Sequence, residues 1–219
     1  MKTYFGVAAL LFTLLVAPAT WAIETSPDIL VDNTAQEILA IIKQDKDIQS
    51  GNKAKILDLV EAKILPHFNF ARMTRLAMGK NWSKATPQQQ QELEKQFRTL
   101  LVRTYYKALS VYSHHTIKVV PLNTMAGDTN VTVKTQVMQS HGPTVTINYS
   151  MEKTSSGWKV YDITVSGISL VINYRGSFNS QIRKGGVEGL LKTLSEKNRT
   201  LDEKDKEKSA ALVKQLKIT

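Results

Sequence analysis

The feature that most constrains the fold is the stretch from Gly157 to Asn179, which reads GWKVYDITVSGISLVINYRGSFN. Aromatic and β-branched residues nearly alternate from Trp158 to Val165, which is the pattern of a half-buried strand. The alternation breaks at Tyr161-Asp162, and such a break predicts a β-bulge that redirects the strand. The chain therefore contains a strand that bends, and the sheet that includes it has to be curved.

The same stretch changes its period after Ser166-Gly167, a pair that marks a turn. Four residues then recur at helical spacing, namely Ile168, Val171, Ile172 and Arg175. A strand that feeds an apolar helix through one glycine predicts a helix laid across the curved sheet.

Three further strands precede this one. The segments 117–122, 131–138 and 145–151 carry β-branched residues, and the last two alternate strictly between apolar and polar side chains. Short turns join consecutive strands, which is typical of an antiparallel meander with one apolar and one solvated face. The sequence thus predicts a four-stranded antiparallel sheet.

Helical periodicity surrounds this sheet on both sides in the sequence. Apolar residues recur at helical spacing over 27–47, 56–64, 68–78, from Pro87 onward, and over 168–184 and 187–198. Helices, then an antiparallel sheet, then helices define an α+β fold with the helices packed on one face. In the helix from Pro87, three tyrosines lie within eight residues (Tyr105, Tyr106 and Tyr112), which suits a central core helix or the mouth of a cavity.

Four segments carry a resemblance to a known family. GWKVYD (157–162), GISLVINYR (167–175), the following SFNSQI and the earlier PHFNFARMTRLAMGKNW resemble the MlaC family of periplasmic phospholipid carriers, also called toluene-tolerance proteins. The resemblance covers nearly the whole chain after residue 22. It implies a cone like that of the nuclear-transport-factor-like fold, extended by N-terminal helices.

The resemblance also implies a function. Family members carry phospholipid between an outer-membrane lipoprotein–porin complex and an inner-membrane ABC transporter with a substrate-binding ring, and so maintain outer-membrane lipid asymmetry. Phospholipid would be the cargo, and no cofactor is implied. We expect a monomer located in the periplasm.

The ends of the chain divide it into three parts. Residues 1–22 have Lys2, a short apolar run and Ala22 at a cleavage position, which predicts a secretory signal peptide. Residues 23–198 form the predicted lipid-binding α+β domain. Residues 199–219 are a charged C-terminal tail, which we expect to be solvated and partly disordered, with docking as a helix as the alternative.

The composition limits the chemistry and the partners. The formal net charge is +10 and there is no cysteine, so disulfides and thiol chemistry are excluded. In an exported protein, this charge favours anionic lipid headgroups or acidic protein surfaces as partners over nucleic acid. The basic residues are scattered along the chain, so the alternative is that they serve solubility alone.

The functional hypothesis that we favour is an apolar chamber that binds lipid. The walls we expect come from the apolar face of the sheet and from flanking helices, although the same composition fits an ordinary closed core. The candidate lipid-binding residues are Leu101, Tyr105, Leu109, Val133, Val137, Ile147, Tyr149, Val160, Ile163, Val165, Ile168, Val171 and Arg175. We expect Arg175, together with Lys134 and Arg103, to contact the lipid phosphate at the mouth of the chamber.

Catalytic and metal-binding signals are weak. The sequence has no G-x-S-x-G, P-loop, G-x-G-x-x-G or H-E-x-x-H motif, and only His114 and His115 are close among its four histidines. We therefore predict neither a metal site nor a catalytic residue. The alternative function is a cone-fold enzyme or small-ligand binder in which Asp162 acts as general base. The competing interpretation of Asp162 is that its carboxylate only makes a structural hydrogen bond.

Overall fold

A computed structural model describes residues 25–111, 115–122, 125, 127–139 and 142–216. The predicted signal peptide lies outside the described residues. None of the helices in these ranges is both long enough and apolar enough to cross a bilayer.

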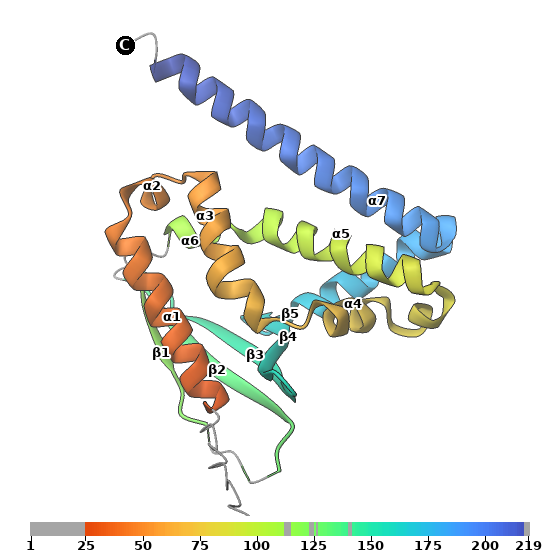
Figure 1. Cartoon of the computed structure of the whole chain (residues 1–219), viewed down its shortest axis with the longest axis horizontal. Coiled ribbons are helices and arrows are strands. Elements are labelled where there is room, and N and C mark those ends of the chain that lie inside the picture. The colour runs from red at the N-terminus through yellow and green to blue at the C-terminus, as the bar shows by residue number, and fades with distance from the viewer. Residues whose placement is uncertain (1–24, 112–114, 123–124, 126, 140–141, 217–219) are drawn as a thin grey trace, which may run out of the picture.

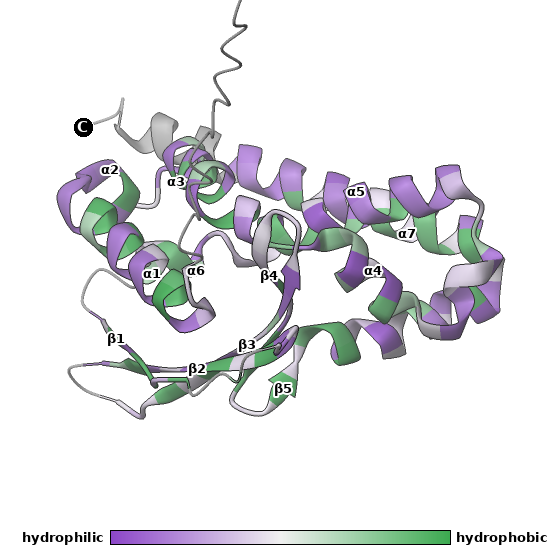
Figure 2. Ribbon diagram, turned by 60° about the horizontal axis from the view of Figure 1, so that its bottom comes forward, coloured by the Kyte–Doolittle hydropathy of each residue, from purple (hydrophilic) through white to green (hydrophobic). Residues whose placement is uncertain are grey.

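The sheet has five antiparallel strands in the order in which they occur in the sequence. They are β1 (Thr116–Val119), β2 (Asn130–Met138), β3 (Val145–Thr154), β4 (Gly157–Val165) and β5 (Ile168–Ser169). The meander predicted from the alternation is confirmed, with one short strand more than we expected. In Figures 1 and 2 the long strands curve as they cross from β1 to β4.

The bulge predicted at Tyr161-Asp162 is confirmed. Ser150 pairs with Asp162, but Met151 pairs with Val160, so Tyr161 is the extra residue on β4. A bulge increases local twist and bends the strand that carries it. The bulge at Tyr161 therefore favours a bend in β4 at this point.

The turn after β4 is tighter than the helical spacing suggested. Ser166 (φ 48°) and Gly167 (φ 85°) both adopt left-handed conformations, which favours a close two-residue hairpin. Ile168 therefore pairs with Val165 in β5, and our placement of Ile168 on a helix is wrong. The helix begins two residues later, at Leu170.

The helices and helical turns precede and follow the sheet as expected. They are α1 (Pro27–Gln44), α2 (Lys46–Gln49), α3 (Lys53–Leu59), the π-helix η1 (Val60–Ile64), the 3-10 turns η2 (Leu65–His67) and η3 (Gly79–Lys84), α4 (Phe70–Met78), α5 (Pro87–Tyr105), α6 (Ala108–Val111) and α7 (Leu170–Leu216).

Local sequence signals fix the ends of several helices. Proline stands in the first turn of α1 and of α5, where its missing N–H is not needed. Thr86 and Gln89 form a capping box at the start of α5, because each side chain bonds the other's backbone N–H. Gly79 (φ 55°) ends α4 in a conformation that favours glycine.

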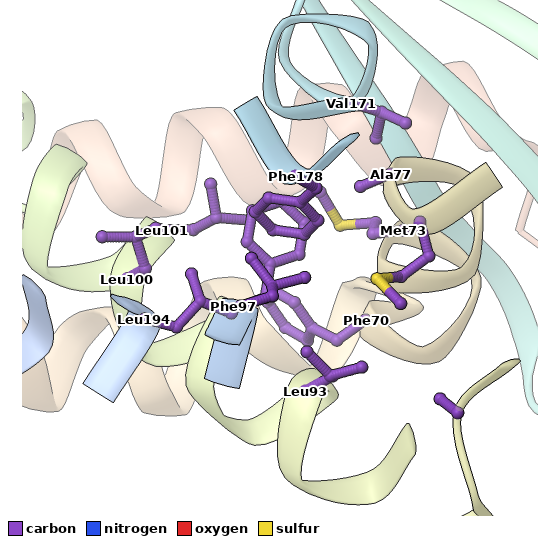
Figure 3. Close-up of a cluster of buried hydrophobic side chains, with 13 residues drawn as sticks. Phe70, Met73, Ala77, Leu93, Phe97, Leu100, Leu101, Val171, Phe178 and Leu194 are labelled. Carbon is purple, nitrogen blue, oxygen red and sulfur yellow. The ribbon is translucent and has the colours of Figure 1, made fainter. Parts of the chain in front are cut away.

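Three separate clusters of buried side chains hold the elements together. The largest joins α4, α5 and α7 around Phe97 and Phe178, whose ring centroids are 5.0 Å apart in an edge-to-face contact (Figure 3). A second joins the N-terminal helices to Tyr106. A third packs Val31 of α1 against the apolar face of the sheet, around Trp158. The helices thus cover one face of the sheet, as predicted.

The C-terminal segment differs from our expectation. After a kink at Gly185-Gly186, α7 runs back along α5 and continues as a helix to Leu216 (Figure 1). Residues 199–216 are helical, which agrees with the alternative expectation of a helix, and the described side chains that dock lie between Leu201 and Asp205. The docking contacts are mainly ionic, which apolar periodicity does not reveal.

The ionic contacts of this segment connect distant parts of the chain. Asp202 pairs with Lys53 at 3.3 Å and with Arg103 at 3.5 Å. Asp205, whose side chain is only 8% exposed, pairs with Lys53 at 3.2 Å and with Lys107 at 2.8 Å. We refer to Asp205, Lys53 and Lys107 below as the Asp205 cluster.

Candidate functional site

Two adjoining cavities lie between the apolar face of the sheet and the helices that cover it. The first, of about 230 Å³, is lined by α1, by the η1–η2 segment, by Leu109 of α6 and by the inner faces of β1 to β4, and it is partly open to the outside. The second, of about 250 Å³, is lined by η1, α4, α5, α6 and the inner faces of β3 and β4, and it is likewise partly open. We call them the α1 lobe and the α5 lobe.

The walls of both lobes are almost wholly apolar. No lysine, arginine, aspartate or glutamate lines either of them. The polar side chains on the walls are Thr34, His67, Tyr105, Tyr106 and Tyr149. A chamber of this composition excludes charged ligand groups and accepts hydrocarbon.

The lobes exist because the three clusters of the core meet without filling the space between them. Met73 and Leu101 belong to the helical cluster, Ile42 to the N-terminal cluster, and Met151 and Val160 to the sheet cluster, yet all five also line a lobe. Each cluster is therefore packed on its own side and open on the side of the cavity.

Nine of the thirteen predicted site residues lie on these walls. Val137 and Val160 line the α1 lobe; Leu101, Tyr105 and Val165 line the α5 lobe; Leu109, Ile147, Tyr149 and Ile163 line both. The alternation of β2, β3 and β4 is what placed the sheet residues on the correct face.

The other four predicted residues have different roles. Val133 is fully buried within the sheet cluster, and Val171 is buried in the helical cluster, so both are core residues. Ile168 is 65% exposed on β5 and lines neither lobe. Arg175 lines neither lobe, and its Nε donates to the carbonyl of Leu76 at 2.9 Å, which holds α4 against α7.

The two other basic residues expected at the mouth of the chamber, Arg103 and Lys134, do not line either lobe. Arg103 donates to the carbonyl of Asn198 and pairs with Asp202. The side chain of Lys134 is exposed and lies on neither wall.

Sequence reasoning missed the contribution of the N-terminal helices. Leu30, Ala35 and Ile38 of α1 line the α1 lobe, and Ile64 and Phe68 line both lobes. An apolar stripe on a helix shows that this side is covered, but not whether side chains or a cavity cover it. The π-helix at η1 carries Ile64, and such irregular turns are frequent at functional sites.

Three ionisable groups on or near the walls have pKa values shifted in the direction that favours the neutral form. Burial, together with the charge of Lys159, lowers the pKa of His67, against an opposing effect of Glu37. Burial and the neighbouring Tyr105 raise the pKa of Tyr174 to about 12. Burial raises the pKa of Tyr106, whose hydroxyl bonds with Lys107 and Asp205, so the Asp205 cluster touches a wall residue of the α5 lobe.

Asp162 has a structural position. Its carboxylate accepts a hydrogen bond from Ser169 Oγ at 2.5 Å and one from the backbone N–H of Val171 at 3.1 Å. It lies opposite Ser150 on β3 and lines neither lobe. The carboxylate thus fixes the first turn of α7 onto β4. Within the described ranges, no three histidine, aspartate or glutamate side chains gather to hold a metal ion.

A rim of exposed apolar side chains adjoins the α5 lobe. Ile168 and Ile172 are 65% and 56% exposed, and Val165 and Tyr105, which line the lobe, are partly exposed as well. Figure 2 shows the β4–β5 hairpin projecting from the body beside the start of α7. We call these four residues the apolar rim.

The fold and the cavity define a class of protein: an α+β domain in which a curved antiparallel sheet and its covering helices enclose an apolar chamber. The sequence model of the family described as MlaC protein matches residues 32–196. The chain belongs to the MlaC family.

Individual relatives agree with this assignment. The chain is 21% identical to the intermembrane phospholipid transport system binding protein MlaC of Haemophilus influenzae, over 87% of this chain and 91% of that protein. It is 26% identical to the toluene tolerance protein ttg2D of Pseudomonas putida, over 81% of this chain and 82% of that protein. Its fold matches the solved structure of a phospholipid-binding protein from Ralstonia solanacearum in complex with a phospholipid, with a TM-score of 0.75 and 40% identity, over 81% of this chain and 99% of that one.

Proposed function

We propose that this protein binds a phospholipid by its acyl chains in the two-lobed chamber and carries it through the periplasm. The observation that supports this most directly is a chamber without charged side chains on its walls in a chain that is 40% identical to a protein described as phospholipid-binding. The protein would act as a carrier, without catalytic turnover.

The energetics require an enclosed chamber for such a cargo. Moving two acyl chains of about 15 CH₂ groups each into water costs about 0.8 kcal/mol per CH₂, or roughly 24 kcal/mol in total. A shallow surface groove recovers only part of this, so both chains have to be buried in the protein. The headgroup stays outside, because the walls offer no charge to pair with its phosphate.

The test is native mass spectrometry of the mature protein purified from its own periplasm, followed by organic extraction of the bound material. We expect one phospholipid mass per protein. A protein that is empty, and that also fails to take lipid from vesicles, would overturn the proposal.

The partners we propose are an outer-membrane lipoprotein–porin complex and an inner-membrane ABC transporter with a substrate-binding ring. The net charge of +10 favours transient docking to acidic faces. The apolar rim lies where a lipid would pass between the α5 lobe and such a partner. We expect the association rate to fall as salt rises from low to physiological concentration, and a rate indifferent to salt contradicts electrostatic docking.

Asp162 separates this proposal from an enzymatic one. If Asp162 were a general base, Asp162→Asn would abolish the catalytic turnover and leave the fold and the bound lipid intact. We expect instead a moderate loss of stability and unchanged lipid transfer per folded molecule. The measurement is lipid transfer between vesicles, alongside a thermal melt.

A further inference from the structure

Acidic residues are absent from two long runs of the sequence. Residues 62–91 and 163–187 contain eight lysines and arginines and no aspartate or glutamate, whereas the rest of the chain has 21 basic and 19 acidic residues. Most of the net charge of +10 therefore comes from these two runs. The carboxylates that border the second run are engaged, because Asp162 accepts two hydrogen bonds at the start of α7 and Glu188 accepts one from Gln89.

The two runs lie side by side in the fold. The first contains α4 and η3, and the second contains the part of α7 that precedes its kink, residues 170–184, which we call the first limb of α7. Arg175 Nε donates to the carbonyl of Leu76 at 2.9 Å, and Asn81 Nδ2 donates to Asn179 Oδ1 at 2.7 Å. In Figure 1, α4 and the first limb lie together on the side of the molecule away from α1.

Five of the eight basic side chains in these runs are exposed, and no ion pair joins any of them to a carboxylate of the described residues. They are Arg75, Lys80, Lys84, Arg183 and Lys184, which we call the basic face. Of the other three, Lys63 and Arg72 pair with glutamates, and Arg175 binds a backbone carbonyl. The basic face is thus a group of charges that the fold itself does not neutralise.

Exposed apolar side chains lie on the same limb of α7. Ile172 is 56% exposed, and it shares one side of the helix with Asn179 and Arg183, because seven and eleven residues are close to whole numbers of helical turns. Ile168, at the tip of the preceding hairpin, is 65% exposed. Two aliphatic side chains therefore adjoin the basic face without an acidic residue between them along the chain.

This combination matches the surface of a bilayer. Proteins that bind at a membrane interface insert apolar side chains at the boundary between headgroups and acyl chains, and their basic side chains attract anionic headgroups. An acidic protein surface would complement the basic face but would leave Ile168 and Ile172 against polar groups. The α5 lobe, lined by Val165 and Tyr105 of the apolar rim, is also open beside this surface.

We propose that the basic face, with Ile168 and Ile172, docks this protein on membrane surfaces that carry anionic phospholipid. The two isoleucines enter the outer edge of the acyl region, and the five basic side chains lie at the level of the headgroups. This proposal goes beyond the proposed function, which requires only a bound lipid and protein partners.

The test is flotation of the protein with vesicles at low and at physiological salt. The vesicles contain dioleoylphosphatidylcholine alone, or equal parts of it and dioleoylphosphatidylglycerol. The charge variant is Arg183→Gln with Lys184→Gln. Its matched control is Lys192→Gln with Lys197→Gln, which removes two exposed charges from the same helix beyond the kink. The apolar variant is Ile172→Ser, and its control is Ile29→Ser, whose side chain on α1 is 52% exposed.

We expect the wild-type protein to bind the anionic vesicles and not the neutral ones, and to bind more weakly at physiological salt. The charge variant should bind about tenfold more weakly, and Ile172→Ser about fivefold more weakly. The salt dependence should persist in Ile172→Ser, because its basic face is intact. Both controls should stay within about twofold of the wild type, since they lie outside the proposed contact.

A thermal melt verifies that each variant is folded, and Ile168→Ser replaces Ile172→Ser where the latter does not fold. The proposal is overturned if the wild type does not prefer anionic vesicles, or if the controls lose as much binding as the variants. Binding to polyglutamate without binding to anionic vesicles also overturns it and identifies an acidic protein surface as the partner. A phospholipid found by native mass spectrometry leaves the carrier function standing in each of these cases.

Discussion

Replacing Asp205 by asparagine tests whether the C-terminal segment is part of the folded domain. The carboxylate is 8% exposed and pairs with Lys53 and Lys107. Removing one partner of a fully buried pair costs about 3–5 kcal/mol, and an exposed pair contributes about 0–1 kcal/mol. Both lysines reach solvent, at 25% and 55% exposure, so we expect Asp205→Asn to lower the free energy of unfolding by about 1–2 kcal/mol. For a domain of this size, this is a drop in Tm of about 3–6 °C.

The difference in the free energy of unfolding between the wild type and Asp205→Asn depends on pH in a definite direction. Burial opposes the charge of Asp205, but hydrogen bonds from Lys107, Lys53 and Tyr106 outweigh burial and lower its pKa below 3.8. A carboxyl with a lowered pKa contributes stability above its unfolded pKa and loses that contribution as the pH falls through the folded value. The gap between the wild type and Asp205→Asn should therefore be full at pH 7 and should shrink below about pH 4.

The assay is urea denaturation followed by circular dichroism, at neutral pH and at a series of acidic pH values. The matched control is Glu203→Gln, which removes the same charge from the same helix, where Glu203 pairs with Arg199 at 3.8 Å on the surface. We expect the control to change the free energy of unfolding by less than about 0.5 kcal/mol. Equal effects of the two substitutions, or a gap that does not change with pH, would refute the reasoning.

Three further predictions concern stability, each measured by urea or thermal unfolding. Phe97→Ala should cost about 3–5 kcal/mol, because the ring is fully buried and meets Tyr174 edge-to-face at 4.9 Å; Phe97→Leu should recover most of this. Asp162→Ala should cost about 1–2 kcal/mol, because the backbone N–H of Val171 loses its acceptor; a neutral result would contradict the capping role. Gly167→Ala should cost about 1 kcal/mol from its φ of 85° alone, since no atom lies within 4 Å of an added Cβ; a stabilised variant would contradict this.

The strands and the inner face of the sheet could be predicted from the sequence because burial on one face leaves a strict period of two. This pattern located Ile147, Tyr149 and Ile163 on the chamber walls and placed the bulge at Tyr161. The tyrosine-rich end of α5 also proved informative, since Tyr105 and Tyr106 line the α5 lobe. Tyr112 lies outside the described residues.

The errors have identifiable physical causes. Ile168 follows a two-residue hairpin, and its spacing to Val171 and Ile172 matched a helix by coincidence. Val133 faces the correct side of the sheet, but neighbouring side chains fill the space above it. Periodicity tells which face is covered and does not tell whether a cavity or a packed cluster covers it, so the role of α1 in the chamber was not predictable.

The Asp205 cluster also bears on how the chain reaches its native state. It joins Lys53 and Lys107 to Asp205. It can therefore form only after almost the entire chain has been synthesised. Until then, Lys53 and Lys107 have no carboxylate of the C-terminal segment to pair with, and Tyr106 lacks one of its hydrogen-bond partners. Contacts so distant in sequence impose a large loop-closure cost and slow the final step of folding. The end of the α5 lobe at Tyr106 is therefore completed only when the C-terminal segment docks, so the last part of the chain to be made is also the part that closes the fold.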